Sequence, residues 1–413
     1  MPFPIKHSLF KAISFGLLVS ISIWPAAMSL VRTDKADQWG INEQILASVI
    51  TEDVINKKLP STIAIPGFQI SEPLTVNYTI DEELEAKAHN LLKRYNPDYG
   101  VFVAINPDNG HILSMVDSAR DGMNHGNLSL SNTFPAASVS KIITTVAALN
   151  EEKANKNTII PFNGKTTTLY KKHVFKHQNN KYTKHLTLTE SFAKSVNSAF
   201  GRLGAVHLGG RTMLDYAHRL GFNGQFSSDF RFDNGRIKVN TTDSWEVAEM
   251  STGYTRNNTL SPLHAAVIAA TAVNGGKLIA PVLISSVIGP HGIPVYQYDE
   301  PASSSVMTAS TSRQLKDMMQ ATVKQGSARK SFRQLQKGVL KDVRIGGKTG
   351  SLTGFHPKGK YDWFVGFAEN QQQKIAYAVL CINKEKWYVK SAQLARQVLE
   401  YYFERDRKEL ASF

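Results

Sequence analysis

The sequence predicts an α/β protein of the α+β type: a five-stranded antiparallel sheet flanked by helices, with an inserted, mostly helical subdomain. Two observations lead to this prediction. Short apolar runs of strand length occur in two groups, at 101–105 and 111–116 and again at 343–348, 363–368 and 375–382. The segments between the groups show helical periodicity instead. A sheet assembled from both ends of the chain, around a helical middle, accounts for both observations.

Each element has its own local signal. Residues 80–92 begin with an acidic turn, which suits the positive end of a helix dipole. Residues 106–110 (NPDNG) separate the two early apolar runs and predict a hairpin turn. Residues 138–149 place apolar side chains at i, i+3, i+4, i+7 and i+8, as one buried helix face requires. Further helices are expected at 186–222, 262–274, 311–324 and about 389–403.

Composition describes an ordinary globular protein. The chain has 413 residues, with 42% hydrophobic and 20% charged residues. Its single cysteine, Cys381, excludes an intrachain disulfide, a CxxC redox motif and a cysteine-rich zinc site. An excess of 48 Lys and Arg over 34 Asp and Glu favours anionic surroundings. The densest basic stretch, 171–185, is accompanied by no nucleic-acid-binding motif, so nucleic acid is not expected as a partner.

The first forty residues bear on the compartment. Residues 12–31 are twenty consecutive residues without a charge, about the length that spans the hydrocarbon core of a bilayer. Lys6 and Lys11 precede them, which favours an uncleaved, single-pass anchor that starts in the cytoplasm. Ala27-Met28-Ser29 also offers a cleavage site, so a removed secretory signal is the alternative. Both interpretations place the rest of the chain outside the cytoplasm.

The chain divides into three parts on these grounds. Residues 1–35 form the anchor or signal segment, and residues 36–75 form a weakly periodic linker or lead-in interrupted by Pro60, Pro66 and Pro73. Residues 76–413 form one large domain. The linker is too short for a second enzymatic module, so a bifunctional enzyme is not expected.

Ser138-Val139-Ser140-Lys141 is an S-x-x-K at the expected start of a helix. A hydroxyl there lies near unpaired N–H groups that can stabilise an oxyanion. An amine one turn later can take the hydroxyl proton if burial lowers its pKa. A serine helix cap followed by a surface lysine is the ordinary alternative, and three other S-x-x-K sequences begin at Ser8, Ser191 and Ser327.

Two further motifs follow in order. Ser195-Val196-Asn197 offers a second hydroxyl for proton relay and an amide that can hold a peptide carbonyl. Lys348-Thr349-Gly350-Ser351 contains the only K-T-G and lies on the first late strand. A lysine flanked by hydroxyls, with a glycine that lets a substrate backbone approach, suits a carboxylate-bearing peptide.

The order S-x-x-K, S-x-N, K-T-G resembles the motif set of the penicillin-binding protein transpeptidase domain, a β-lactamase-like family. Other segments are similar to the same family, and the resemblance covers roughly 76–405. These segments are the start of the domain and first hairpin (76–81 and 100–116), the second-motif helix (189–200), the helix starting at 261–264, and the strand 362–367.

The resemblance implies a role for each motif residue. Ser138 is then the acylated nucleophile, Lys141 its general base and Ser195 a proton shuttle. Asn197 binds the substrate side-chain amide, and Lys348, Thr349, Gly350 and Ser351 also belong to the substrate-binding site. Lys348 raises the local positive potential, and the hydroxyls of Thr349 and Ser351 hold the terminal carboxylate. The N–H groups of Ser138 and Ser351 form the oxyanion hole. Neither a metal nor an organic cofactor is implied.

The implied activity is a D,D-transpeptidase that cross-links peptidoglycan stem peptides and is inhibited by β-lactams. A D,D-carboxypeptidase, a serine β-lactamase, or a non-turnover β-lactam sensor or scaffold are the alternatives. Other cell-wall synthesis proteins are possible partners, and the catalytic domain is expected on the periplasmic side of the inner membrane. Gly253-Tyr254-Thr255, Ser261 and His264 depart from the family's usual G-Q-G and T-P-L-Q, which bears on pocket shape.

Overall fold

The computed structural model describes residues 40–68, 72–176, 179–299, 302–333 and 337–410. The expected anchor or signal segment therefore lies outside the described residues. Across the described ranges, no helix is both long and apolar enough to cross a membrane.

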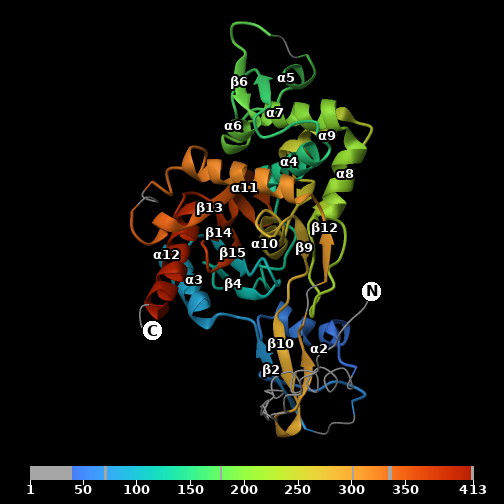
Figure 1. The fold of residues 1–413 in the computed structure, drawn as a ribbon, viewed down its shortest axis with the longest axis vertical. Coiled ribbons are helices and arrows are strands. Elements are labelled where there is room, and N and C mark those ends of the chain that lie inside the picture. The colour runs from blue at the N-terminus through green and yellow to red at the C-terminus, as the bar shows by residue number, and fades with distance from the viewer. Residues whose placement is uncertain (1–39, 69–71, 177–178, 300–301, 334–336, 411–413) are drawn as a thin grey trace, which may run out of the picture.

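A five-stranded antiparallel sheet forms the centre of the molecule, as predicted (Figure 1). The strand order is β13-β14-β15-β3-β4. Their bounds are β3 (Tyr99–Ile105), β4 (Ile112–Ala119), β13 (Arg344–Phe355), β14 (Lys358–Glu369) and β15 (Lys374–Asn383). The early and late groups meet where β15 pairs with β3, with Val103 opposite Ala378. The predicted fold class is confirmed.

The two faces of this sheet are covered by different helices. Alternate residues of β15 face opposite sides: Ala378 belongs to one apolar cluster and Cys381 to the other. Helices α3 (Glu82–Tyr95) and α12 (Ser391–Leu410) cover the Cys381 side, and α10 (Pro262–Ala270) packs on the other. Both sides of β15 are thus closed to solvent, and Cys381 is fully buried.

The β13–β14 hairpin is longer than the sequence predicted. Gly354 and Gly359, which lie between the strands predicted at 343–348 and 363–368, pair with each other within β13 and β14. A Cβ on Gly354 would lie 2.3 Å from the ring of Tyr361, so a glycine is needed where the strands pack this closely. The missing side chain made these positions resemble a loop in the sequence.

The inserted subdomain contains α4 (Lys141–Asn150), α5 (Lys171–Phe175), α6 (Leu188–Ala193), α7 (Asn197–Arg202), a π-helical turn (Leu203–Leu208), α8 (Gly210–Arg219) and α9 (Ser244–Thr252). It also contains the hairpin β5 (Ile159–Phe162)–β6 (Lys184–Thr187) and the short pair β7 (Arg236–Ile237)–β8 (Asn258–Thr259). α11 (Ala309–Lys324) returns the chain to β13.

The single helix predicted at 186–222 is wrong. Ser195 has φ +58° and separates α6 from α7. Residues two apart on one continuous helix face different directions. The break at Ser195 removes this restriction and lets Ser195 and Asn197 approach the same pocket.

A smaller unit lies below the central sheet in Figure 1. It contains α2 (Glu43–Ile55) and the sheet β1-β2-β10-β11, formed by β1 (Thr62–Ile63), β2 (Leu74–Tyr78), β10 (Ile284–Ile288) and β11 (Pro294–Gln297). β9 (Lys277–Ile279) and β12 (Ser303–Ser305) form a separate pair. The segment predicted as a linker therefore contains ordered elements. The domain boundary at residue 76 stays a prediction.

Candidate active site

Ser138 lies in a 3₁₀ turn (Ala137–Ser140) that leads directly into α4, whose first residue is Lys141. The Nζ of Lys141 lies 2.8 Å from the Oγ of Ser138, 2.8 Å from the Oδ1 of Asn197 and 2.7 Å from the carbonyl oxygen of Thr252. The last two oxygens can only accept. A neutral amine donates both its hydrogens to them, which leaves its lone pair for the proton of the Ser138 hydroxyl.

The surroundings of Lys141 favour that neutral amine. The residue is fully buried, and burial lowers its pKa well below the usual value. The positive charge of Lys348 lowers this pKa further. Both effects act on the ammonium form, so they make Lys141 a base that can act at lower pH than an exposed lysine.

Lys348 connects the third motif with the second. Its Nζ donates to the Oγ of Ser195 and to the carbonyl oxygen of Thr349, each at 2.9 Å. It is fully buried, and burial lowers its pKa to about 7. A hydroxyl held by such a group can receive and return a proton near neutral pH.

Asn197 is held from two sides. Its backbone N–H donates to the carbonyl oxygen of Thr166 and its Nδ2 to that of Thr167, while its Oδ1 accepts from Lys141. Both ends of the amide already have protein partners. The structure therefore gives Asn197 a positioning contact with Lys141, beside any contact with substrate.

The edge of the central sheet fixes the turn that carries Ser138. The indole N–H of Trp363 on β14 donates to the carbonyl oxygen of Pro135, at 2.9 Å. A Cβ on Gly350 would lie 3.2 Å from the Val139 side chain and 3.3 Å from the Ala136 oxygen. The glycine of K-T-G therefore allows β13 to lie against the turn.

These residues surround one pocket of about 410 Å³. Six of the eight predicted site residues line it, and Lys141 and Lys348 are buried beside it through their contacts with Ser138 and Ser195. The six are Ser138, Ser195, Asn197, Thr349, Gly350 and Ser351. The convergence of the three motifs on one pocket is thus present in the structure, while the role of each residue stays a prediction.

The sequence missed several lining residues. Ser327 lies with its Oγ 2.6 Å from the Oγ1 of Thr349, and Lys194 and Lys330 also line the pocket. Tyr254, which the sequence connected with pocket shape, lines it as well. Ser327 and Lys330 form one of the other S-x-x-K sequences, and Ser191 and Lys194 form another; no local pattern distinguished either lysine as a pocket residue. Their nearness to the K-T-G strand depends on tertiary contacts. The hydroxyl of Ser351, which was expected to hold a substrate carboxylate, donates to the backbone carbonyl oxygen of Tyr361 at 3.2 Å.

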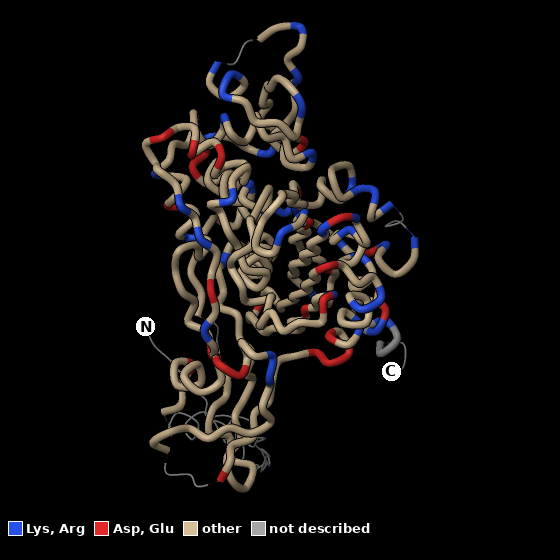
Figure 2. The backbone as a smooth tube through the Cα atoms, turned by 180° about the vertical axis from the view of Figure 1, so that it is seen from behind, with Lys and Arg blue, Asp and Glu red and all other residues tan. Residues whose placement is uncertain are grey.

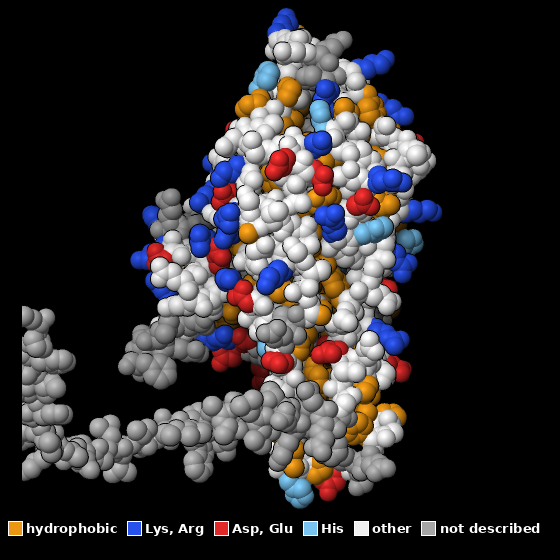
Figure 3. All heavy atoms as spheres, turned by 45° about the vertical axis from the view of Figure 1, so that its right-hand side comes forward, with side chains coloured by type: hydrophobic (Ala, Val, Ile, Leu, Met, Phe, Trp, Pro, Cys, Tyr) orange, Lys and Arg blue, Asp and Glu red, His pale blue; other side chains and the backbone are white. Residues whose placement is uncertain are grey.

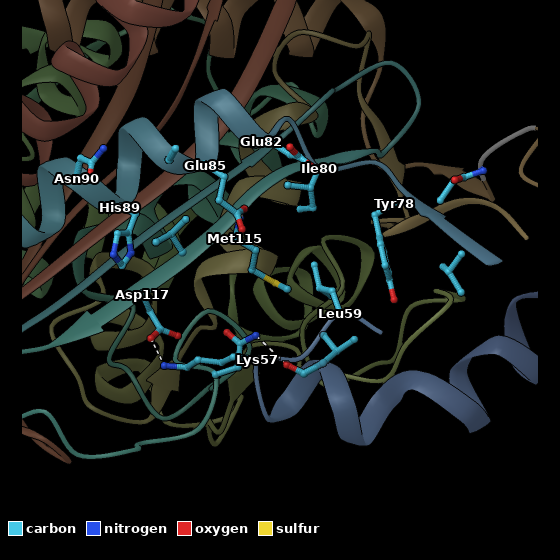
Figure 4. A pocket seen from close by; sticks show the side chains of 16 residues that line it. Lys57, Leu59, Tyr78, Ile80, Glu82, Glu85, His89, Asn90, Met115 and Asp117 are labelled. Carbon is cyan, nitrogen blue, oxygen red and sulfur yellow. Dashed lines mark hydrogen bonds and ion pairs between the residues drawn. The ribbon is translucent and has the colours of Figure 1, made fainter. Parts of the chain in front are cut away.

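A second cavity of about 970 Å³ lies between α3, β4 and the chain after α2 (Figure 4). An ion pair between Lys57 and Asp117 crosses it, and the Oε2 of Glu85 accepts the N–H of Met115 at 3.0 Å. Its lining contains no Ser, Thr or Cys. It therefore lacks a nucleophile comparable to Ser138. In the described part of the chain no cluster of three or more potential metal ligands occurs.

Comparison with known proteins agrees with this geometry. A model of the penicillin-binding protein transpeptidase domain matches residues 100–400. Stage V sporulation protein D of Bacillus subtilis is 25% identical over 361 residues, which cover 80% of this chain and 53% of that protein. Peptidoglycan D,D-transpeptidase PbpA of Mycobacterium tuberculosis is 28% identical over 346 residues, covering 75% and 67%. The chain thus spans about half the length of the first of these relatives.

Solved structures share the fold. Penicillin-binding protein A of Mycobacterium tuberculosis has a TM-score of 0.66 at 24% identity, covering 79% of this chain and 82% of that one. Its ceftriaxone acyl-enzyme complex has the same score and identity, covering 86% and 82%. A D,D-transpeptidase domain from Eggerthella lenta has a TM-score of 0.67 at 18% identity, covering 88% and 91%. From the match over most of its length, the chain belongs to the family of penicillin-binding protein transpeptidase domains.

Proposed function

We propose that this protein is a serine D,D-transpeptidase of peptidoglycan that is acylated by β-lactams. The observation that carries the proposal is the contact of a fully buried amine, that of Lys141, with the hydroxyl of Ser138. Membership of the family supports it, as do the relatives named D,D-transpeptidase.

In the first step Lys141 takes the proton of the Ser138 hydroxyl while Oγ attacks the carbonyl carbon of the penultimate D-Ala. The N–H groups of Ser138 and Ser351 stabilise the resulting oxyanion; losing one such donor typically costs on the order of 10²–10³ in rate. Ser195 passes its proton to the departing amine of the terminal D-Ala and takes one from the ammonium of Lys348, which donates to its hydroxyl oxygen. The C–N bond breaks and an ester to Ser138 remains.

In the second step an amine of a neighbouring strand attacks the ester. Ser195 takes the proton of the attacking amine and returns one to Lys348, while Lys141 gives the proton it holds back to the Oγ of Ser138. Hydrolysis by water gives the carboxypeptidase or β-lactamase alternative. Asp362 is the one carboxyl group that lines the described pocket, and it is buried and accepts the N–H of Ser391 at 2.8 Å. Because the Asp362 carboxylate already accepts a hydrogen bond from the protein, we do not assign it the activation of a water molecule. Attack on the ester by an amine is therefore favoured over hydrolysis.

Two measurements test the proposal. Purified protein incubated with a fluorescent penicillin should form a long-lived adduct, which Ser138→Ala should abolish. The protein should then transfer the acyl group of a D-Ala-D-Ala peptide to an added amine. Rapid release of opened penicillin identifies a β-lactamase instead, and a stable adduct without amine-dependent transfer identifies a sensor or scaffold.

We further propose that residues 12–31 anchor the protein in the cytoplasmic membrane, with the catalytic domain on the periplasmic side. The uncharged run and the extracytoplasmic position of peptidoglycan support this placement. Contacts with other cell-wall synthesis proteins belong to the same proposal. The mass of the mature N-terminus distinguishes an anchor from a cleaved signal, and protease digestion of intact spheroplasts tests the side of the membrane.

A further inference from the structure

A cationic tip projects from the inserted subdomain. Residues 153–189 contain eight lysines and no Asp or Glu. We define the cationic tip by five exposed lysines of this stretch: Lys165, Lys172, Lys176, Lys181 and Lys184. Figure 2 shows basic positions and no acidic position along the tip, and in Figure 3 the uppermost part of the molecule carries basic and His side chains.

The charges of the tip are not neutralised within the described chain. The neighbouring ion pairs, Lys156 with Asp317 and Lys194 with Glu190, lie where the tip joins the rest of the subdomain. None of the five lysines takes part in an ion pair with a described carboxylate, although Lys184 donates to the Gly164 oxygen at 3.3 Å. Concentrated unpaired positive charge attracts a polyanion.

The tip is joined to the active site by hydrogen bonds. β5 pairs with β6, and Val174 of α5 is fully buried, so the lysines stand on folded elements. Lys165 precedes Thr166 and Thr167, whose carbonyl oxygens hold Asn197. Thr167 also lines the pocket that contains Ser138. The base of the tip therefore adjoins the pocket that contains Ser138.

The positive surface continues into the pocket. Lys194 and Lys330 line it, and both are exposed. Asp362 contributes the acidic group of the lining but is almost fully buried. A linear ligand that carries several carboxylates along its length meets exposed lysines on the tip and again at the pocket, with the Lys194–Glu190 ion pair at the junction between them.

We propose that the cationic tip binds the peptidoglycan strand that carries the reacting stem peptide, through the carboxylates of neighbouring stem peptides on that strand. The inference rests on the proposed function and extends it to a second binding region for the polymeric substrate. A strand with repeated carboxylates fits a row of lysines that ends in the pocket. A membrane surface fits less well, because membrane-bound helices need a long apolar face and α5 has five residues.

A matched pair of full-length variants tests this proposal. The tip variant carries Lys172→Gln, Lys176→Gln, Lys181→Gln and Lys184→Gln. The control variant carries Lys58→Gln, Lys93→Gln, Lys277→Gln and Lys386→Gln, which removes the same charge from exposed positions elsewhere. Neither set includes a residue of the pocket. Acylation by a fluorescent penicillin should be unchanged in both, because a small β-lactam does not reach the tip.

Binding is measured by co-sedimentation with insoluble peptidoglycan at low and high salt. The tip variant should lose about tenfold or more in affinity at low salt, and the control much less, because clustered charge focuses the field. High salt should remove the difference. Peptidoglycan with amidated stem-peptide carboxylates should bind the unchanged protein as weakly as native peptidoglycan binds the tip variant.

Three outcomes overturn the proposal: equal losses in the two variants, binding that ignores salt, or binding that ignores amidation. Tighter lysine-dependent binding to a polyphosphate or to vesicles of anionic lipid assigns the tip to another partner and also overturns it. Failure of the unchanged protein to react with penicillin refutes the proposed function instead, and this assay needs no polymer.

Discussion

The protonation state of Lys141 depends on which side chains surround its amine. Asn197 and Thr252 supply oxygens that accept from either form of the amine, and neither supplies a negative charge. Burial and the charge of Lys348 both lower its pKa. Replacing a neutral partner with an anion should therefore change the base more than replacing it with an apolar group.

Asn197→Asp tests this. A carboxylate at the position of Oδ1 should raise the pKa of Lys141 by about 1–3 units, as an adjacent opposite charge does. The rate of penicillin acylation, measured against pH, should then fall at neutral pH and recover at alkaline pH. Asn370→Asp, which keeps the oxygen that accepts two backbone N–H groups in a distant turn, is the control. If the fall in acylation rate on the acid side of the pH profile occurs at the same pH in Asn197→Asp as in the unchanged protein, Lys141 is not the base.

Lys348 makes a second pH prediction, on stability. Its pKa falls from 10.5 to about 7 on folding, so the unfolded chain binds more protons in that window. Between pH 7 and 10.5 the contribution of Lys348 to the free energy of unfolding therefore rises with pH, by up to about 1.4 kcal/mol per pH unit. The same contribution is lost as the pH falls back toward 7. Lys348→Met should flatten the slope relative to the unchanged protein in urea unfolding at several pH values. If the free energy of unfolding changes equally with pH in the two proteins, Lys348 does not lose its proton on folding in this pH range.

At the scale of elements, His264 joins α10 to the chain beside it. Its Nδ1 accepts the N–H of Gly235 at 2.8 Å, and its Nε2 donates to the oxygen of Leu220 at 2.7 Å. A glutamine amide also has one acceptor and one donor end. This explains why histidine can stand where relatives commonly have the glutamine of T-P-L-Q.

His264→Gln should therefore preserve the fold, whereas His264→Leu should destabilise it by about 1–3 kcal/mol for each unsatisfied group. Burial lowers the pKa of His264 from 6.5 to about 4, so its stabilising effect is lost as pH falls through that interval. Thermal unfolding between pH 7 and 4 should show a smaller acid loss in His264→Gln. A glutamine variant as unstable as the leucine variant would refute the two-bond role.

Gly253 ends α9 and lies against the turn that carries Ser138. It has φ +69°, and a Cβ there would lie 1.7 Å from the carbonyl oxygen of Ala137. Gly253→Ala should lower both the melting temperature and the rate of penicillin acylation, because the turn must move. Gly224→Ala, where the nearest atom is 3.7 Å away, is the matched control and should change neither. Full acylation in Gly253→Ala would show that the contact does not position Ser138.

The elements also show what a sequence can predict. The hairpin at 106–110, the start of α4 and the three late strands have strong local patterns, and the motifs they carry identified the pocket. The break at Ser195 was missed because residues on both sides favour helix locally. Ser327 was missed because its contact with Thr349 forms only in the folded chain. The strand β2 was missed because its partner β10 lies more than two hundred residues away.

At the scale of the whole molecule, several polar contacts attach the lower unit. Asp229 accepts the N–H groups of Leu283 and Ile284 at the start of β10. Lys57 pairs with Asp117 of β4, and Asn127 donates its Nδ2–H and its backbone N–H to the carbonyl oxygens of Val54 and Ile55 at the C-terminal end of α2. The Asp117 carboxylate is almost fully buried, whereas Lys57 is partly exposed.

Lys57→Met should leave the buried carboxylate without its cation. We expect a loss of about 1 kcal/mol, small because the lysine is screened by solvent, and faster hydrogen exchange confined to α2 and β1. The penicillin acylation rate should stay unchanged, since the ion pair lies outside the pocket. Lys58→Met, at the next exposed position, is the control. Slower acylation in Lys57→Met would mean that the lower unit influences the active site.

The sealed position of Cys381 has a practical consequence. Burial raises the pKa of this thiol to about 12, and neither face of its strand meets solvent. Maleimide reagents should leave the native protein unmodified. A cysteine introduced at Tyr182, whose side chain is highly exposed, should then accept a single fluorophore or spin label without any background substitution. The natural sequence therefore allows surface motion to be followed by spectroscopy with a label at one chosen position.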